Sequence, residues 1–172
     1  TTTTTLIAHP QDALKLILKE NTATAKEKVV WVSKTPAIVL PGSDPMVVGA
    51  TFRVKNPVSG ETGTTLLPAL SWGTNAAGSL YKFVNKLAPG WPSTVKVAVV
   101  KSGKLLKVVG KDALISLDEA TQGTVGVDLT IGLDRYCSEC SVSIKDAPGV
   151  YIAKGCLAPL ACMSPSGAFL DD

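Results

Sequence analysis

All four cysteines of the 172-residue chain lie close to its C-terminal end: Cys137, Cys140, Cys156 and Cys162. Cysteines at such spacings can attach haem, bind zinc, do redox chemistry or form disulfides. A c-type haem needs a histidine directly after C-x-x-C, but Ser141 follows Cys140 and the single histidine is His9. A zinc site is disfavoured because the second pair is spaced C-x5-C and contains Pro159. A redox pair usually opens a helix, whereas this C-x-x-C lies in a strand-like run.

The residues between the two cysteine pairs favour disulfides. The run Asp146–Gly149 is a strong turn signal with strand-like residues on both sides. Folding the chain at that turn brings Cys140 opposite Gly155 or Cys156 and leaves Cys137 a few residues short of Cys162. We therefore predict the bridges Cys140–Cys156 and Cys137–Cys162, although four cysteines allow three pairings. Each bridge closes a loop for which chain entropy gives about 3 kcal/mol.

Disulfides persist in oxidising compartments, so the cysteines predict an extracellular or cell-surface location. The sequence starts TTTTTLIAH without a methionine, which fits either a mature exported chain or a fragment. We predict no bound metal and no cofactor.

The elements that hold these cysteines read as β-strands. The long run Gly123–Leu133 alternates, with Val125, Val127, Leu129, Ile131 and Leu133 on one face. Asp128 lies on the opposite, polar face, where we expect it to be solvated. The run Gln11–Asn21 fits either a short helix or a strand. Gly and Pro recur every 8–12 residues or so, which favours an all-β fold, an antiparallel β-sandwich with a disulfide-stapled C-terminal hairpin.

A weak internal repeat accompanies this pattern. Ile38 matches Ile115 and Val54 matches Ile131, both at an offset of 77 residues. The repeat predicts a sandwich built from two similar halves, although β-rich sequences also resemble one another by chance. We divide the chain into an N-terminal strand or tail, residues 1–12, and a single sandwich domain, residues 13–172.

Several segments resemble a diffuse group of uncharacterised exported bacterial β-rich domains. The segments are Lys28–Leu40, Val48–Val54, the Gly103–Val108 hairpin, and the closure from Arg135–Cys137 to Pro159–Cys162. The resemblance covers most of the chain from about Leu14 onward and implies export and a Cys137–Cys162 bridge. It implies no activity, and the Cys140–Cys156 pair is an addition to the pattern.

Charge and composition exclude several classes of function. The chain has 17 basic and 14 acidic residues, and its lysines are scattered along the sequence without a polybasic run. We therefore expect no nucleic-acid partner. No apolar run approaches the ~20 residues of a membrane-spanning helix. His9 is the only histidine and no pair of carboxylates stands out, so we expect no enzymatic activity.

The N-terminal segment is the most suggestive feature. Its side chains are uncharged and, apart from Leu6, β-branched: Thr1, Thr2, Thr3, Thr4, Thr5, Leu6 and Ile7. Such a segment could form an edge strand of its own domain or complete the sheet of a neighbouring copy. The second alternative predicts a structural subunit of a cell-surface or extracellular assembly, with copies joined into a filament by strand exchange.

A second hypothesis is a carbohydrate- or surface-binding module. Planar aromatic side chains often stack on sugars, and Trp72 and Trp91 both lie in loop contexts. Trp31 lies within a strand, and we expect it in the core. The polysaccharide hypothesis therefore depends on Trp72 and Trp91 being exposed.

Overall fold

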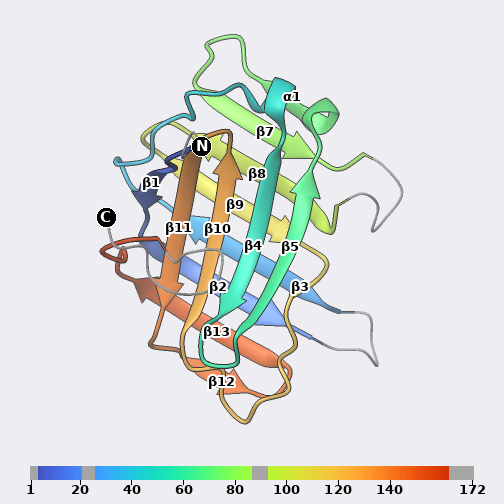
Figure 1. The fold of residues 1–172 in the computed structure, drawn as a ribbon, viewed down its shortest axis with the longest axis vertical. Helices are drawn as coiled ribbons and strands as arrows, with labels where there is room; N and C mark the ends of the chain where they lie inside the picture. The colour runs from blue at the N-terminus through green and yellow to red at the C-terminus, as the bar shows by residue number, and fades with distance from the viewer. Residues whose placement is uncertain (1–3, 21–25, 87–92, 163–172) are drawn as a thin grey trace.

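The computed structural model describes residues 4–20, 26–86 and 93–162. These residues form two β-sheets packed face to face, and the strands of one sheet cross those of the other (Figure 1). The predicted all-β sandwich is therefore confirmed. Two short helical segments complete the described fold, α1 (Pro45–Val48) and the 3-10 turn η1 (Ala69–Ser71).

The first sheet has five strands in the order β1-β11-β10-β4-β5. These strands are β1 (Ile7–Pro10), β4 (Ala50–Asn56), β5 (Glu61–Leu67), β10 (Val125–Ile131) and β11 (Asp134–Cys140). The second sheet has eight strands in the order β12-β13-β2-β3-β9-β8-β7-β6. These strands are β2 (Ala13–Lys19), β3 (Lys28–Ser33), β6 (Trp72–Thr74), β7 (Leu80–Val84), β8 (Val95–Lys101), β9 (Leu105–Gly110), β12 (Lys145–Ala147) and β13 (Val150–Cys156).

Successive side chains of a strand point to opposite faces, so the alternating apolar residues of each strand lie on one face and pack in the core. The inward residues of β10 are at most 2% exposed: Val125, Val127, Leu129 and Ile131. Leu133 was predicted on the same face, but it lies beyond the end of the strand and is 42% exposed. The ambiguous run Gln11–Asn21 contains strand β2, in which Leu16 and Leu18 alternate into the core.

The strand order is symmetric between the two halves of the chain. Each strand from β2 to β7 has a counterpart six strands later, and the counterparts occupy two-fold-related positions in both sheets. The central pairs β3–β9 and β4–β10 are antiparallel, as a two-fold axis requires. The matched residues Val54 and Ile131 lie in the counterparts β4 and β10. Among the described strands, only β1 has no counterpart.

Both predicted disulfides are present, Cys137–Cys162 and Cys140–Cys156. The C-terminal hairpin consists of β12 and β13, which flank the predicted turn at Asp146–Gly149. Cys140 ends β11 in the five-stranded sheet, whereas Cys156 ends β13 in the eight-stranded sheet. Their bridge therefore ties the two sheets together. Such bridges indicate an oxidising, non-cytoplasmic environment.

In the part of the chain that the structure describes, no helix has both the length and the apolar character needed to cross a bilayer.

Candidate functional site

The N-terminal segment supplies an edge strand to its own five-stranded sheet. Strand β1 runs parallel to β11, with Ile7 opposite Asp134 and Pro10 opposite Cys137. The Ile7 amide donates to the Leu133 carbonyl over 2.7 Å. Ile7, the last residue of the predicted assembly segment, therefore pairs within its own chain.

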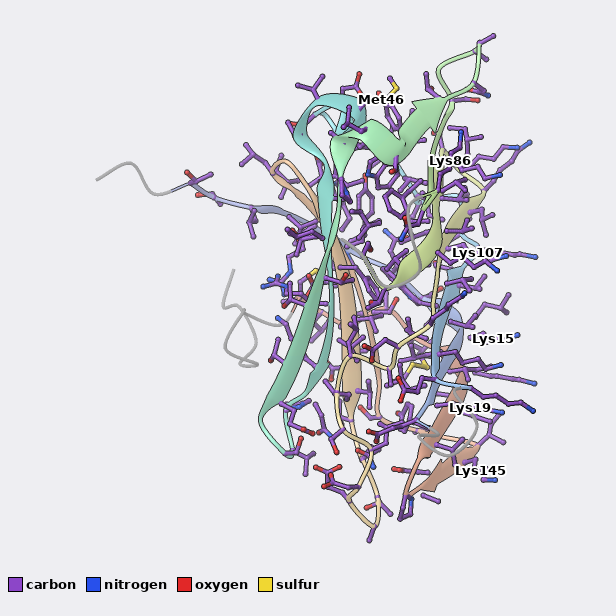
Figure 2. All side chains as sticks on the ribbon, turned by 90° about the vertical axis from the view of Figure 1, so that its right-hand side faces the viewer. Lys15, Lys19, Met46, Lys86, Lys107 and Lys145 are labelled. Carbon is purple, nitrogen blue, oxygen red and sulfur yellow. A yellow bond between two sulfur atoms is a disulfide. The ribbon has the colours of Figure 1, made fainter. Side chains whose placement is uncertain are left out.

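The residues just before β1 leave the sandwich. Thr4 and Thr5 are exposed, and Thr4, Thr5 and Leu6 belong to no secondary structure. Figure 2 shows this start of the described chain, in faint blue, running away from both sheets. Thr1, Thr2 and Thr3 lie outside the described residues. The described part of the assembly segment thus projects from the edge on which β1 is anchored.

A polar contact fastens β1 to β11. His9 Nε2 lies 2.7 Å from Asp134 Oδ1, and the His9 ring stacks on Tyr136 with centroids 5.0 Å apart. Asp134 Oδ2 accepts a hydrogen bond from the Gly42 amide over 2.8 Å. Burial and the nearby Asp134 charge raise the pKa of the Tyr136 hydroxyl. The single histidine therefore has a positioning role at this edge.

The opposite edge of the same sheet is β5. Its residues alternate between the core, where Thr65 and Leu67 are buried, and the outer face, where Thr62 and Thr64 are exposed. Leu66 on that outer face is 60% exposed. Within the described residues β5 pairs only with β4.

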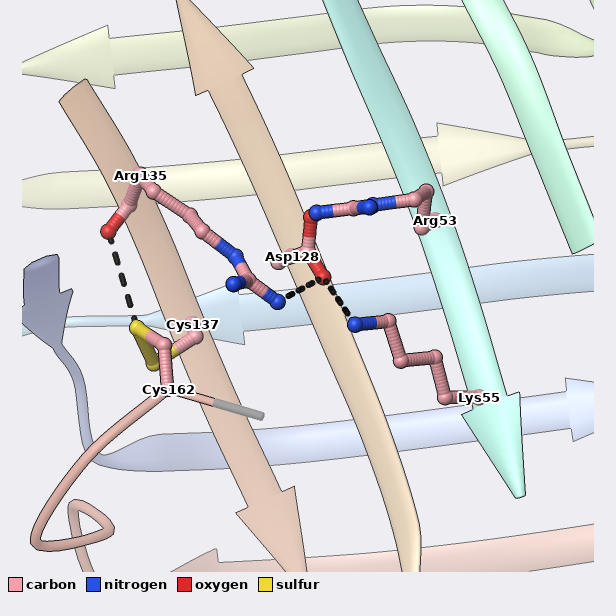
Figure 3. Close-up of polar contacts among 6 residues, drawn as sticks. All are labelled: Arg53, Lys55, Asp128, Arg135, Cys137 and Cys162. Atoms are coloured by element: carbon pink, nitrogen blue, oxygen red, sulfur yellow. Dashed lines mark hydrogen bonds and ion pairs between the residues drawn. A yellow bond between two sulfur atoms is a disulfide. The ribbon is translucent and has the colours of Figure 1, made fainter. Parts of the chain in front are cut away.

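A buried charge cluster lies on the outer face of the five-stranded sheet (Figure 3). Asp128 accepts from Arg53 Nε over 2.9 Å and from Arg135 Nη2 over 3.0 Å, and Lys55 Nζ lies 3.5 Å away. Asp128 is 2% exposed, so the expectation of a solvated carboxylate was wrong. Cys162 Sγ lies 3.7 Å from the Arg135 carbonyl, so the chain that follows β13 returns across this face.

The cluster places three cations around one carboxylate, with consequences for proton binding. Burial lowers the pKa of the Lys55 amine from 10.5 to about 8, because desolvation outweighs the attraction of Asp128. The positive charges of Arg135 and Arg53 add to this lowering. Burial also raises the pKa of Glu139, which lines a small pocket with Lys55 and Asp128.

Comparisons with protein-family models, with curated proteins and with solved structures give no match. The function is therefore inferred from the chain's own geometry.

Of the two tryptophans on which the carbohydrate hypothesis depends, the structure describes only Trp72. Trp72 is 7% exposed, its Nε1 donates to the Leu67 carbonyl over 3.2 Å, and its ring packs against Phe83. Its ring is therefore not displayed as an open platform, although it lines one wall of an apolar groove with Leu70 and Val84. Trp91 lies outside the described residues. Trp31 is fully buried, as expected.

Three carboxylates meet beside the start of β5: Glu61, Asp118 and Glu119. Their oxygens lie within 4.8 Å of one another, and the Ser59 hydroxyl donates to Glu61. Exposed acidic groups commonly gather in this way, and we assign them no role.

Sequence reasoning missed the importance of β5 and of the buried cluster. Alternating threonines at residues 62 and 64 are a signal for an edge strand with one exposed face. Arg53 and Lys55 alternate along β4 opposite Asp128, and this pairing could have indicated an ion pair. Its burial could not be predicted, because the covering segment lies beyond residue 156.

Proposed function

We propose that the protein is an exported structural subunit of a cell-surface or extracellular assembly. In this proposal its role is not enzymatic, and copies join when the N-terminal segment of one copy adds a strand to the next. The single observation that supports it is the outer edge of β5, which pairs with no strand among the described residues and is the two-fold counterpart of the edge that holds β1. The disulfides are consistent with export.

Matching contacts support the correspondence between β5 and β11. The fifth residue of β11, Ser138, donates to the Gln11 carbonyl over 2.8 Å as the chain enters β2. The fifth residue of β5, Thr65, accepts from the Thr94 amide over 3.2 Å as the chain enters β8. At the same position of each edge a hydroxyl therefore contacts the incoming chain, although Ser138 donates its hydrogen bond and Thr65 accepts one.

The halves differ in what precedes these contacts. In the first half, the chain before Gln11 runs along β11 as β1. In the second half, the strand that precedes the contact is β7, which belongs to the other sheet. Asn85, directly after β7, donates from Nδ2 to the Ser93 carbonyl over 2.9 Å. Within the described residues, no strand takes the position beside Glu61–Thr64 that corresponds to β1.

The connection that follows β9 does not fill this position either. It approaches β5 from the core side, where a side chain at Gly63 would collide with the Leu114 carbonyl. Its counterpart after β3 approaches the equivalent residue of β11, and Tyr136 Oη donates to the Val39 carbonyl over 2.9 Å. Beside β11, strand β1 and the connection after β3 are both accommodated. An added strand and the connection after β9 can therefore both be accommodated beside β5.

The edge of β5 also lacks the usual protection against strand addition. It carries no charge and no proline from Thr62 to Leu67, and such edges readily pair with other chains. The outer strands of the eight-stranded sheet, β6 and β12, are only three residues long. Donor and acceptor lie on opposite edges of one sheet, so contacts between copies would be head-to-tail and would form open filaments.

Sedimentation velocity and negative-stain electron microscopy of the natively isolated protein test this proposal. Removing residues 1–6, which leaves β1 intact, should abolish assembly. Thr5→Pro should weaken assembly because it removes an amide donor, whereas Thr5→Ser should not. The pair Thr62→Lys and Thr64→Lys should block the acceptor edge, with Val142→Lys as an exposed control.

Two results would contradict the proposal at different levels. Dispersed monomers of the intact chain under all conditions would reject an assembly. Filaments that persist after removal of residues 1–6 would reject strand exchange alone. Trp72 gives the carbohydrate alternative no comparable support because its ring is buried.

A further inference from the structure

The fold gathers lysines that are scattered in the sequence. Eight lysines occupy the outer face of the eight-stranded sheet: Lys15, Lys19, Lys28, Lys82, Lys101, Lys107, Lys145 and Lys154. Figure 2 shows the labelled side chains among them pointing away from the sandwich. We call this surface the lysine face.

Strand register aligns four of these lysines in one row. The row crosses six neighbouring strands in the order Lys154, Lys15, Val32, Lys107, Val99 and Lys82. Neighbouring strands lie about 4.8 Å apart, so the row is about 24 Å long. The next row is apolar from Ile152 to Val84. The face therefore presents a line of positive charge beside a strip of branched apolar side chains.

Within the eight strands that form the lysine face, no acidic side chain lies on the same side as the lysines. Asp146 is the only acidic residue within the eight strands, and it is paired with buried Tyr151 on the core side. Its carboxylate accepts from the Gln122 and Gly123 amides over 2.6 and 2.9 Å. None of the eight lysines forms an ion pair with a described residue.

Two pairs of lysines lie directly opposite each other on neighbouring strands. Lys15 faces Lys154, and Lys19 faces Lys28. Like charges in such positions destabilise a sheet. A bound polyanion would turn this repulsion into attraction, because each anionic group could lie between two ammonium groups.

The row also contains a shallow groove of about 370 Å³. Three lysines, Lys15, Lys34 and Lys107, line it together with apolar side chains of Leu14, Val32 and Leu105. Lysine stems can pack along such apolar surface while the ammonium groups stay in water. The groove could therefore hold a chain by its apolar faces while the lysines neutralise its charges.

We propose that the lysine face binds an extended acidic polysaccharide. Neither row carries an aromatic side chain on which a base could stack, which disfavours single-stranded nucleic acid. The side chains between the lysines are short and branched, and neither row includes an aromatic residue that could anchor the protein in a lipid surface. The disulfides indicate an oxidising compartment, which is consistent with a ligand outside the cytoplasm. This inference does not depend on assembly through β5.

Binding of polygalacturonate to the full chain tests the inference. The triple variant Lys15→Gln, Lys82→Gln and Lys107→Gln removes three charges from the row. It should weaken binding at low salt by about tenfold or more. A matched control replaces Lys26, Lys104 and Lys111 by Gln, since these residues are exposed and lie outside the strands. The control should change affinity by less than about twofold.

Dextran, anionic lipid vesicles and duplex DNA complete the test. Neutral dextran should not bind, and binding of polygalacturonate should weaken as salt is added. Equal losses in the two triple variants would reject a specific face and leave net charge as the cause. Failure of polygalacturonate to bind at low salt, or tighter binding of vesicles or DNA, would overturn the proposal.

Discussion

Arg135 donates a hydrogen bond to Asp128 over 3.0 Å, although their side chains are only 1% and 3% exposed. A buried ion pair gives little net stability, because the cost of desolvation offsets the attraction. Breaking such a pair is costly, because a charge then remains in a poorly solvated place. Asp128 therefore links β10 to both neighbouring strands through side-chain contacts, to β4 through Arg53 and to β11 through Arg135.

Replacing Asp128 by asparagine should destabilise the protein strongly. The change leaves Arg53, Lys55 and Arg135 close together without the carboxylate between them. We expect a loss of about 3–5 kcal/mol in the free energy of unfolding, measured by chemical denaturation with the disulfides intact. The exposed Asp118→Asn variant is the matched control and should stay within about 0.5 kcal/mol. Similar losses in the two variants would contradict the central role of Asp128.

The lowered pKa of Lys55 predicts that stability depends on pH. Between about pH 8 and pH 10.5 the unfolded chain keeps a proton on this amine that the folded protein has released. The free energy of unfolding therefore rises with pH in this window, by at most about 3 kcal/mol for this group. Lys55→Met should remove this contribution. Denaturation at pH 7 and pH 9.5 would reveal it as a difference between the two proteins, and equal slopes would refute it.

The two disulfides should differ in their effect on this pH dependence. Each should contribute about 3 kcal/mol through chain entropy. Replacing Cys137 and Cys162 by serine should also release the segment over the cluster and raise the pKa of Lys55 toward its ordinary value. Replacing Cys140 and Cys156 should leave that pKa unchanged. The pH slope of stability distinguishes the two variants, and an unchanged slope in both would show that the segment does not control solvation of the cluster.

Asp134→Ala should loosen β1 without unfolding the sandwich. The substitution removes the contact with His9 and the hydrogen bond from Gly42, at a cost of about 1–3 kcal/mol. Hydrogen exchange should accelerate at the Ile7 and Gln11 amides while the Leu129 amide stays protected. Unchanged exchange at Ile7 would mean that the backbone ladder alone holds β1.

The local sequence pattern was sufficient to predict the main strands and the pairing of the cysteines. Alternation in β10 placed Val125 and Ile131 in the core because a strand has only two faces. The turn at Asp146–Gly149 was enough to pair Cys140 with Cys156. The same local logic could not show that these cysteines belong to different sheets.

Features that depend on contacts between residues far apart in the sequence could not be predicted from the sequence pattern. The solvated position expected for Asp128 was wrong, since polarity along β10 does not reveal what covers its outer face. The pairing of Ile7 with Asp134 joins segments 127 residues apart. The lysine face was missed for the same reason, because Lys15 and Lys107 become near neighbours only through the order of β2, β3 and β9.

The two-fold strand order also determines when a newly made chain can fold. Strand β3 waits for β9 and β4 waits for β10, so the first half cannot complete either sheet by itself. A chain that emerges with its N-terminus first exposes these strand edges until residues 105–131 have followed. Such late pairing is slow and invites aggregation. The symmetry therefore leaves one edge of β3 and one edge of β4 unpaired until the second half of the chain is available.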